Sequence, residues 1–169
     1  MSLLRSLNVL VVDDHDHMLA IASTILRGAG VRSVHEASDG LAALGILGSK
    51  PIDLALVDYN MFPLDGVEMT RRVRAGLDGV NTYLPIIMMS GHAEKSRIHA
   101  ARDAGVTEFL AKPLTAKAII KRIKSVILNP RPFVKTETYC GPCRRRKEAA
   151  NYAGPLRRSA DADGAFNAA

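Results

Sequence analysis

The stretch from Leu54 to Met61 reads LALVDYNM, in which four consecutive apolar residues end at an aspartate, Asp58. A short run of consecutive apolar residues is typical of a strand that is buried on both faces. Strands of this kind occur in parallel sheets that helices cover on both sides. This stretch therefore predicts an internal strand of an α/β domain, with Asp58 at its carboxyl end.

Further strand candidates recur along the chain and alternate with helical patterns. The five candidates are residues 9–12, 33–37, 54–57, 86–89 and 108–110. Apolar residues at intervals of three and four, the period of a helix, are clearest in residues 18–26 and 119–127. Five alternating units of strand and helix predict a doubly wound α/β fold with a five-stranded parallel sheet.

Length and composition agree with one globular domain. The 169 residues are close to the usual length of a domain, and a content of 47% hydrophobic and 24% charged residues excludes disorder of the whole chain. No apolar run approaches the roughly 18–20 residues that a membrane span needs. The first residues do not form a signal peptide either, so we expect a cytoplasmic protein.

The composition changes after residue 128. We therefore place the α/β domain at residues 5–128 and a C-terminal tail at residues 129–169. The tail carries eight basic and four acidic side chains, and hence +4 of the net charge of +6. Its prolines and its lack of apolar periodicity are typical of an extended or partly disordered segment. Three uses of the tail remain open, namely a solubilising extension, a docking or dimer arm, and a contact for nucleic acid.

The tail contains a two-copy repeat, Tyr-x-Gly-Pro-x-Arg-Arg, at residues 139–145 and 152–158. Neither copy is long enough to form its own core, so the repeat predicts two short docking motifs rather than a second domain. The candidate contact residues are Tyr139, Arg144, Arg145, Tyr152, Arg157 and Arg158.

Both cysteines of the chain lie in the first copy of this repeat. Cys140 and Cys143 have the Cys-Gly-Pro-Cys spacing of a redox-active dithiol. Ala153 and Leu156 occupy the same positions in the second copy, which favours cysteines that fill variable positions of the repeat. A dithiol oxidoreductase remains an alternative, as does a zinc site, which would need two more ligands.

Polar residues follow the predicted strands at the edge where their carboxyl ends meet. Asp13 and Asp14 follow the first strand, Asp58 the third, Ser90 the fourth and Lys112 the fifth. Ligands of open α/β sheets bind at this edge, and three neighbouring carboxylates repel one another unless a cation is present. Oxygen ligands suit Mg²⁺, while a hydroxyl and a lysine can hold phosphoryl oxygens. The pattern predicts a site where a carboxylate accepts a phosphoryl group beside a metal ion.

Over roughly residues 7–128, the chain resembles the receiver domains of two-component response regulators. The matching elements are the Asp13-Asp14 pair, Asp58, the Asp65-Gly66 pair, Ser90 and the Lys112-Pro113 pair. The resemblance implies a flavodoxin-like fold and a single-domain regulator similar to those of chemotaxis. It also implies a signalling protein that is not an enzyme in the usual sense, because it catalyses only its own phosphotransfer and dephosphorylation.

The resemblance also implies roles for the residues of the acceptor and metal site. Asp58 would accept the phosphoryl group, and Asp13, Asp14, Asp58 and the backbone carbonyl of Asn60 would bind Mg²⁺. One departure from the family pattern follows these residues, since Phe62 stands where a proline is usual. This departure predicts a changed loop rather than a changed metal site.

A second group of residues is implied to sense the phosphoryl group. Lys112 and Ser90 would contact its oxygens, with Ser90 as the switch hydroxyl and Phe109 as the aromatic side chain that changes rotamer with it. Pro113 would follow a cis peptide bond that orients Lys112.

Two features beside the site have local explanations. Asp65 precedes a predicted helix and is expected to be its N-cap. His15 and His17 are expected to be solvated polar residues at the start of the first helix rather than metal ligands.

The partners that the resemblance implies are proteins. A sensor histidine kinase or a histidine phosphotransfer protein would donate the phosphoryl group, and phosphorylation would control binding to a downstream protein, with a homodimer also possible. The alternative is a nucleic-acid-binding regulator in which phosphorylation gates the basic tail.

Overall fold

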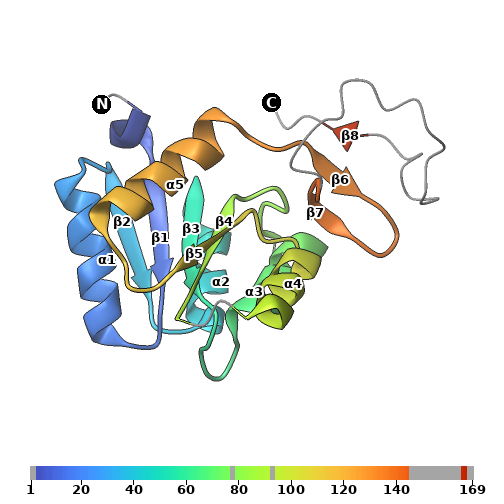
Figure 1. The fold of residues 1–169 in the computed structure, drawn as a ribbon, viewed down its shortest axis with the longest axis horizontal. Helices are drawn as coiled ribbons and strands as arrows, with labels where there is room; N and C mark the ends of the chain where they lie inside the picture. Colours follow the sequence, from blue (N-terminus) through green and yellow to red (C-terminus); the bar gives the residue numbers. More distant parts are fainter. Residues whose placement is uncertain (1–2, 77–78, 92–93, 145–164, 167–169) are drawn as a thin grey trace.

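A computed structural model describes residues 3–76, 79–91, 94–144 and 165–166. Its main sheet has five parallel strands in the order β2-β1-β3-β4-β5, which confirms the predicted doubly wound, flavodoxin-like α/β fold (Figure 1). The strands are β1 (Asn8–Val12), β2 (Ser33–Ala37), β3 (Leu54–Asp58), β4 (Ile86–Ser90) and β5 (Glu108–Ala111). Every residue of β3 and β4 is buried, as their continuous apolar sequence predicts.

Among the described residues, five α-helices cover the two faces of the sheet, and a short 3-10 helix, η1 (Leu3–Ser6), precedes β1 (Figure 1). They are α1 (Asp16–Gly28), α2 (Gly40–Ser49), α3 (Gly66–Ala75), α4 (Lys95–Ala104) and α5 (Ala116–Leu128). Alternate residues of β1 enter two separate cores: Leu10 and Val12 pack with α2, α3 and α4, whereas Val9 and Val11 pack with α1 and α5. Within the described part of the chain, no helix is long and apolar enough to cross a membrane.

The start of α3 brings this helix against the end of β3. Asp65 caps the helix as predicted, because its carboxylate accepts a hydrogen bond from the Glu68 amide at 2.8 Å. Gly66 comes next, and a Cβ at this position would meet the backbone carbonyl oxygen of Asp58 and would lie 2.9 Å from the sulfur of Met88. The glycine therefore lets α3 approach the strand that carries Asp58.

The segment after α5 is more ordered than the tail expected from composition. Strands β6 (Phe133–Lys135) and β7 (Cys140–Pro142) form an antiparallel hairpin, the C-terminal hairpin. Strand β8 (Ala165–Phe166) pairs with the other edge of β6. Strands β6 and β7 are extended, as expected, but they are paired with each other. Phe133 of β6 is buried, and its ring centre lies 5.3 Å from that of Tyr83. The division of the chain at residue 128 stays a prediction, because part of the tail packs against the domain. The second copy of the repeat lies outside the described residues.

We expect Gly66→Ala to lower the free energy of unfolding by about 1–3 kcal/mol, the usual cost of overpacking, because its methyl group would push α3 away from β3. Gly45→Ala in α2 is the matched control: a Cβ there meets nothing within 4 Å. It should raise stability by roughly 0.4–1 kcal/mol, since alanine restricts the unfolded chain. Urea unfolding of the two variants measures both effects, and equal stabilities would contradict the close approach at Gly66.

Candidate functional site

The predicted site residues meet at the carboxyl edge of the main sheet. Asp13 follows β1, Asp58 is the last residue of β3, Ser90 is the last residue of β4 and Lys112 follows β5. The amide of Lys112 donates to the carbonyl oxygen of Ser90 at 2.8 Å, which ties the ends of β4 and β5 together. This edge lies where the strand order reverses on either side of β1, the usual ligand-binding position of open α/β sheets.

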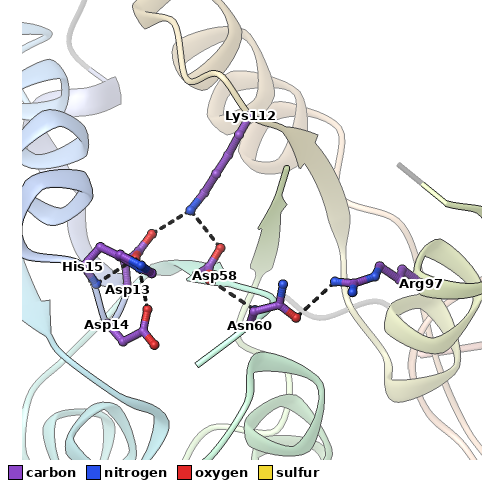
Figure 2. A network of polar contacts seen from close by, with 7 residues as sticks. All are labelled: Asp13, Asp14, His15, Asp58, Asn60, Arg97 and Lys112. Carbon is purple, nitrogen blue, oxygen red and sulfur yellow. Dashed lines mark hydrogen bonds and ion pairs between the residues drawn. The ribbon is translucent and has the colours of Figure 1, made fainter. Parts of the chain in front are cut away.

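The ammonium group of Lys112 bridges two buried carboxylates (Figure 2). Its Nζ atom lies 2.9 Å from Oδ2 of Asp13 and 2.9 Å from Oδ1 of Asp58. The side chain of Asp13 is fully buried and that of Asp58 is 8% exposed. The second oxygen of Asp58 accepts a hydrogen bond from the backbone amide of Asn60 at 3.1 Å.

The environment disfavours the charged form of Asp58 and favours the charged form of Lys112. Burial raises the pKa of Asp58 above its ordinary value of 3.8, and although Lys112 counteracts this, the negative charge of Asp13 adds to it. Burial lowers the pKa of Lys112, but its contacts with Asp13 and Asp58 outweigh burial, so the pKa is raised overall. One ammonium shared between two carboxylates remains charged, whereas each carboxylate has less than a full counter-charge.

The donor atoms at this edge fit a divalent cation. Oxygen atoms of Asp13 and Asp14 lie within 4.8 Å of each other and of a ring nitrogen of His15. Together with Asp58 these residues supply three carboxylates beside the single ammonium of Lys112, and carboxylate oxygens are the ligands that Mg²⁺ prefers. Asp13, Asp14 and Asp58 therefore make a suitable set of protein ligands.

His15 belongs to this cluster in a way that the sequence did not indicate. Its side chain is 70% exposed, as expected, but Nδ1 lies 2.6 Å from Asp14 and 3.2 Å from Asp13. Hydrogen bonding to Asp13 and the charges of both carboxylates raise the pKa of His15. His17 is exposed, as expected.

The remaining predicted residues divide between this edge and other places. Ser90 is buried, Phe109 of β5 packs partly buried against the core beside α2, α3 and α4, and the bond before Pro113 is cis. Tyr139 and Arg144 instead lie on the C-terminal hairpin, where the Arg144 guanidinium is 4.2 Å from the Tyr139 ring centre. The other tail candidates, Arg145, Tyr152, Arg157 and Arg158, lie outside the described residues.

Arg97 of α4 is a neighbour of the site that the sequence did not predict (Figure 2). It donates a hydrogen bond from Nη1 to Oδ1 of Asn60 at 3.0 Å, and its guanidinium lies 5.1 Å from the centre of the Tyr59 ring. It thereby holds both residues that follow Asp58. Phe62, which departs from the family pattern, is 83% exposed in the same loop.

A five-stranded sheet in this order, with buried aspartates and a lysine at its carboxyl edge, defines a receiver domain. The family model "Response regulator receiver domain" matches residues 9–124. The chain therefore belongs to the family of two-component response regulators with a receiver domain.

The relatives are chemotaxis proteins and other receivers. The chain is 34% identical over 120 residues to the chemotaxis protein CheY of Pseudomonas aeruginosa, covering 71% of this chain and 95% of that protein. It is 32% identical over 122 residues to CheY-3 of Vibrio cholerae, covering 72% of this chain and 92% of the relative. Among solved structures, CheY4 of Vibrio cholerae is 28% identical with a TM-score of 0.66, covering 71% of this chain and 98% of that one.

A second solved structure is a receiver domain of a sensor histidine kinase. The receiver domain of the sensor histidine kinase PA1611 of Pseudomonas aeruginosa, described with a magnesium ion coordinated in its active-site cleft, is 27% identical to this chain. Its TM-score is 0.66, and the match covers 73% of this chain and 98% of that structure.

We expect Asp58→Asn to be more stable than the wild type near neutral pH in a buffer with a metal chelator. Because the pKa of Asp58 is raised by folding, the folded state holds the proton more firmly than the unfolded state does. This carboxyl therefore reduces stability as the pH rises above the ordinary value of 3.8 through the folded-state pKa. Urea unfolding from pH 3.5 to 7 should show an advantage of the variant that grows with pH; a constant or shrinking advantage would contradict the assignment.

Proposed function

We propose that the protein is a single-domain response regulator in which Asp58 accepts a phosphoryl group from a phosphohistidine in an Mg²⁺-dependent reaction. The observation that carries this proposal is the Lys112 ammonium 2.9 Å from both Asp58 and Asp13 at the ligand-binding edge of the sheet. The donor would be a sensor histidine kinase or a histidine phosphotransfer protein. The chain would catalyse only its own phosphotransfer and dephosphorylation.

In the transfer step an oxygen of ionised Asp58 attacks phosphorus, so that a P–O bond forms and the P–N bond to the donor imidazole breaks. The electron pair of the broken bond stays on the imidazole nitrogen, which takes a proton from solvent. Lys112, whose Nζ atom lies 2.9 Å from Oδ1 of Asp58, would pair with the negative oxygens of the arriving group, while the Asn60 amide donates to Oδ2 of Asp58. Mg²⁺ held by Asp13, Asp14, Asp58 and the Asn60 carbonyl would neutralise the negative charge that accumulates there.

The consequence of phosphorylation would be transmitted through the ends of β4 and β5. Ser90, the last residue of β4, would donate its hydroxyl to a phosphoryl oxygen, and its carbonyl accepts a hydrogen bond from the Lys112 amide. Phe109 lies on the adjacent strand opposite Met88 and is only partly buried, and it would change its rotamer together with Ser90. Phosphorylation would thus shift the equilibrium between two conformations that differ in the surface near β4 and β5. This shift would control binding to a downstream protein or to a second copy of this chain.

The tail does not favour the alternative of a nucleic-acid-binding regulator. The described basic residue of the first repeat copy, Arg144, is engaged within the chain, by the Tyr139 ring and by an ion pair of 3.4 Å with Asp103. These contacts use the guanidinium and the aromatic face that would otherwise meet a phosphate and a base.

Phosphorylation of the full chain by acetyl phosphate, followed by intact-mass measurement, tests the proposal. With Mg²⁺ the wild type should gain the mass of one phosphoryl group, and chelation of Mg²⁺ should abolish the gain. Asp58→Asn should gain nothing because the nucleophile is gone. Asp53→Asn is the matched control, since this aspartate lies at the opposite end of β3 and bonds the Asn8 amide at 2.7 Å; it should be phosphorylated like the wild type.

An adduct that persists in Asp58→Asn, or that forms equally well without Mg²⁺, would contradict the proposed site. A wild type that stays unmodified by acetyl phosphate and by phosphorylated histidine kinases would contradict the proposed function as a whole.

Ser90→Ala separates the transfer step from the switch. This variant should still be phosphorylated, because neither the nucleophile nor the proposed metal ligands change. The phosphorylation-dependent change in amide hydrogen exchange of β5 and of the segment before it should fall at least about fivefold, since a lost hydrogen bond to a charged group costs roughly 1.5–3 kcal/mol. An exchange response as large as that of the wild type would show that Ser90 does not carry the signal.

A further inference from the structure

The C-terminal hairpin docks on the edge of the main sheet opposite the phosphorylation site. Its anchor is Arg74 of α3, which is only 5% exposed. Arg74 donates from Nε to the carbonyl of Gly105 at 2.9 Å and from Nη1 to that of Thr82 at 2.7 Å, and its guanidinium lies 5.0 Å from the centre of the Phe133 ring. Burial lowers the pKa of Arg74 to about 10, so the side chain is still charged at neutral pH. The hairpin thus covers a buried cation.

Both cysteines take part in this docked arrangement through their backbone. A Cβ on Gly105 would lie 2.5 Å from the carbonyl oxygen of Cys140, so this strand touches the end of α4. The amide of Cys143 donates to the carbonyl of Pro132 at 2.7 Å, and its carbonyl accepts from Arg131 at 3.2 Å. Docking therefore fixes the backbone at both ends of the Cys-Gly-Pro-Cys segment.

The docked backbone keeps the two thiols apart. Cys140 begins β7, Pro142 pairs with Phe133, and the bond from Cys143 to Pro132 continues the same ladder. Three residues of extended strand span about 10 Å, at roughly 3.3 Å per residue, and neighbouring side chains alternate between the two faces. A disulfide needs Cα atoms within about 7 Å of each other. The docked hairpin is therefore incompatible with a bond between the two cysteines, which are both free and half-buried.

We propose that Cys140 and Cys143 form an oxidisable dithiol whose disulfide and whose docked hairpin exclude each other. Closing the bond draws the segment into a turn at Gly141 and Pro142. That turn removes the pairing of Pro142 with Phe133 and the hydrogen bond from Cys143 to Pro132. Oxidation therefore releases the hairpin from Arg74, and by reciprocal coupling the docked hairpin protects the dithiol from oxidation.

The oxidant is a low-molecular-weight disulfide such as glutathione disulfide. One cysteine thiolate attacks a sulfur of this disulfide, which forms a mixed disulfide and releases one thiol. The second cysteine then attacks the protein sulfur of the mixed disulfide and releases the other thiol. Two electrons pass from the two cysteines to the oxidant, and the two cysteine protons end on the two released thiols.

Hydrogen exchange on the wild-type chain tests whether the two states exclude each other. The full chain is equilibrated in mixtures of glutathione and glutathione disulfide, and intact mass with thiol labelling gives the fraction that carries the intramolecular disulfide. In the reduced form the amides of Cys143 and Thr136 are hydrogen-bonded, to Pro132 and Tyr139, and should be protected. We expect both to lose protection in the oxidised form, and retained protection there would overturn the proposal.

A variant of the docking contact tests the coupling from the other side. Phe133→Ala removes the ring that packs on Arg74 and Tyr83, and should speed disulfide formation about tenfold or more by raising the undocked population. Leu128→Ala, at the 61% exposed end of α5, is the matched control and should oxidise like the wild type. Equal rates in both variants would overturn the proposal, as would a dithiol that forms no intramolecular bond in either variant at any glutathione ratio.

The exchange measurement and a phosphorylation assay on the same samples complete the test. Should Phe133→Ala fail to fold, the exchange comparison needs only the wild type and still decides the question. Phosphorylation of Asp58 by acetyl phosphate, measured on the same reduced and oxidised samples, reports on the proposed function separately, because the two sites lie at opposite ends of the sheet.

Discussion

The ammonium of Lys112, shared between two carboxylates, is the interaction on which the carboxyl edge of the main sheet depends. Two carboxylates with almost no exposure, Asp13 and Asp58, face the same region, and their repulsion would be severe without the lysine between them. The lysine nevertheless supplies one charge for two carboxylates. Burial raises the pKa of Asp58, and the negative charge of Asp13 adds to this effect. A site with more carboxylates than cations favours further positive charge.

The parallel sheet makes this arrangement possible. In a parallel sheet all carboxyl ends meet at one edge, so residues from four separate strand ends become neighbours without any special loop. Continuous apolar sequence buries β3 and β4 on both faces, as in other parallel sheets covered by helices. Gly66 then allows α3 to lie against the end of β3. The chemistry of the site is thus positioned by apolar packing several residues away from it.

The fold and the location of the site could be predicted because both follow from short-range patterns. The apolar runs identify the strands, and the residue after each run identifies the edge of the site. Contacts between distant segments have no such pattern. Arg97 reads as an exposed residue of a helix, and nothing in the sequence indicates that it reaches Asn60. His15 was expected to be exposed, which it is, but its contact with Asp14 depends on how the loop after β1 turns.

The C-terminal hairpin shows the same limit more strongly. Its strands have three residues each and no apolar alternation, so composition alone predicts an unpaired tail. Its docking depends on Arg74, a residue type that is rarely buried, and on a close approach of Gly141 to Gly105. The buried guanidinium of Arg74 donates to two backbone carbonyls, and the hairpin covers it with the ring of Phe133. The hairpin also reaches the connection between α4 and β5 at Gly105, while Lys112 lies at the other end of β5. The four residues of β5 therefore connect the end of the sheet that carries Lys112 with the end on which the C-terminal hairpin and its cysteines dock.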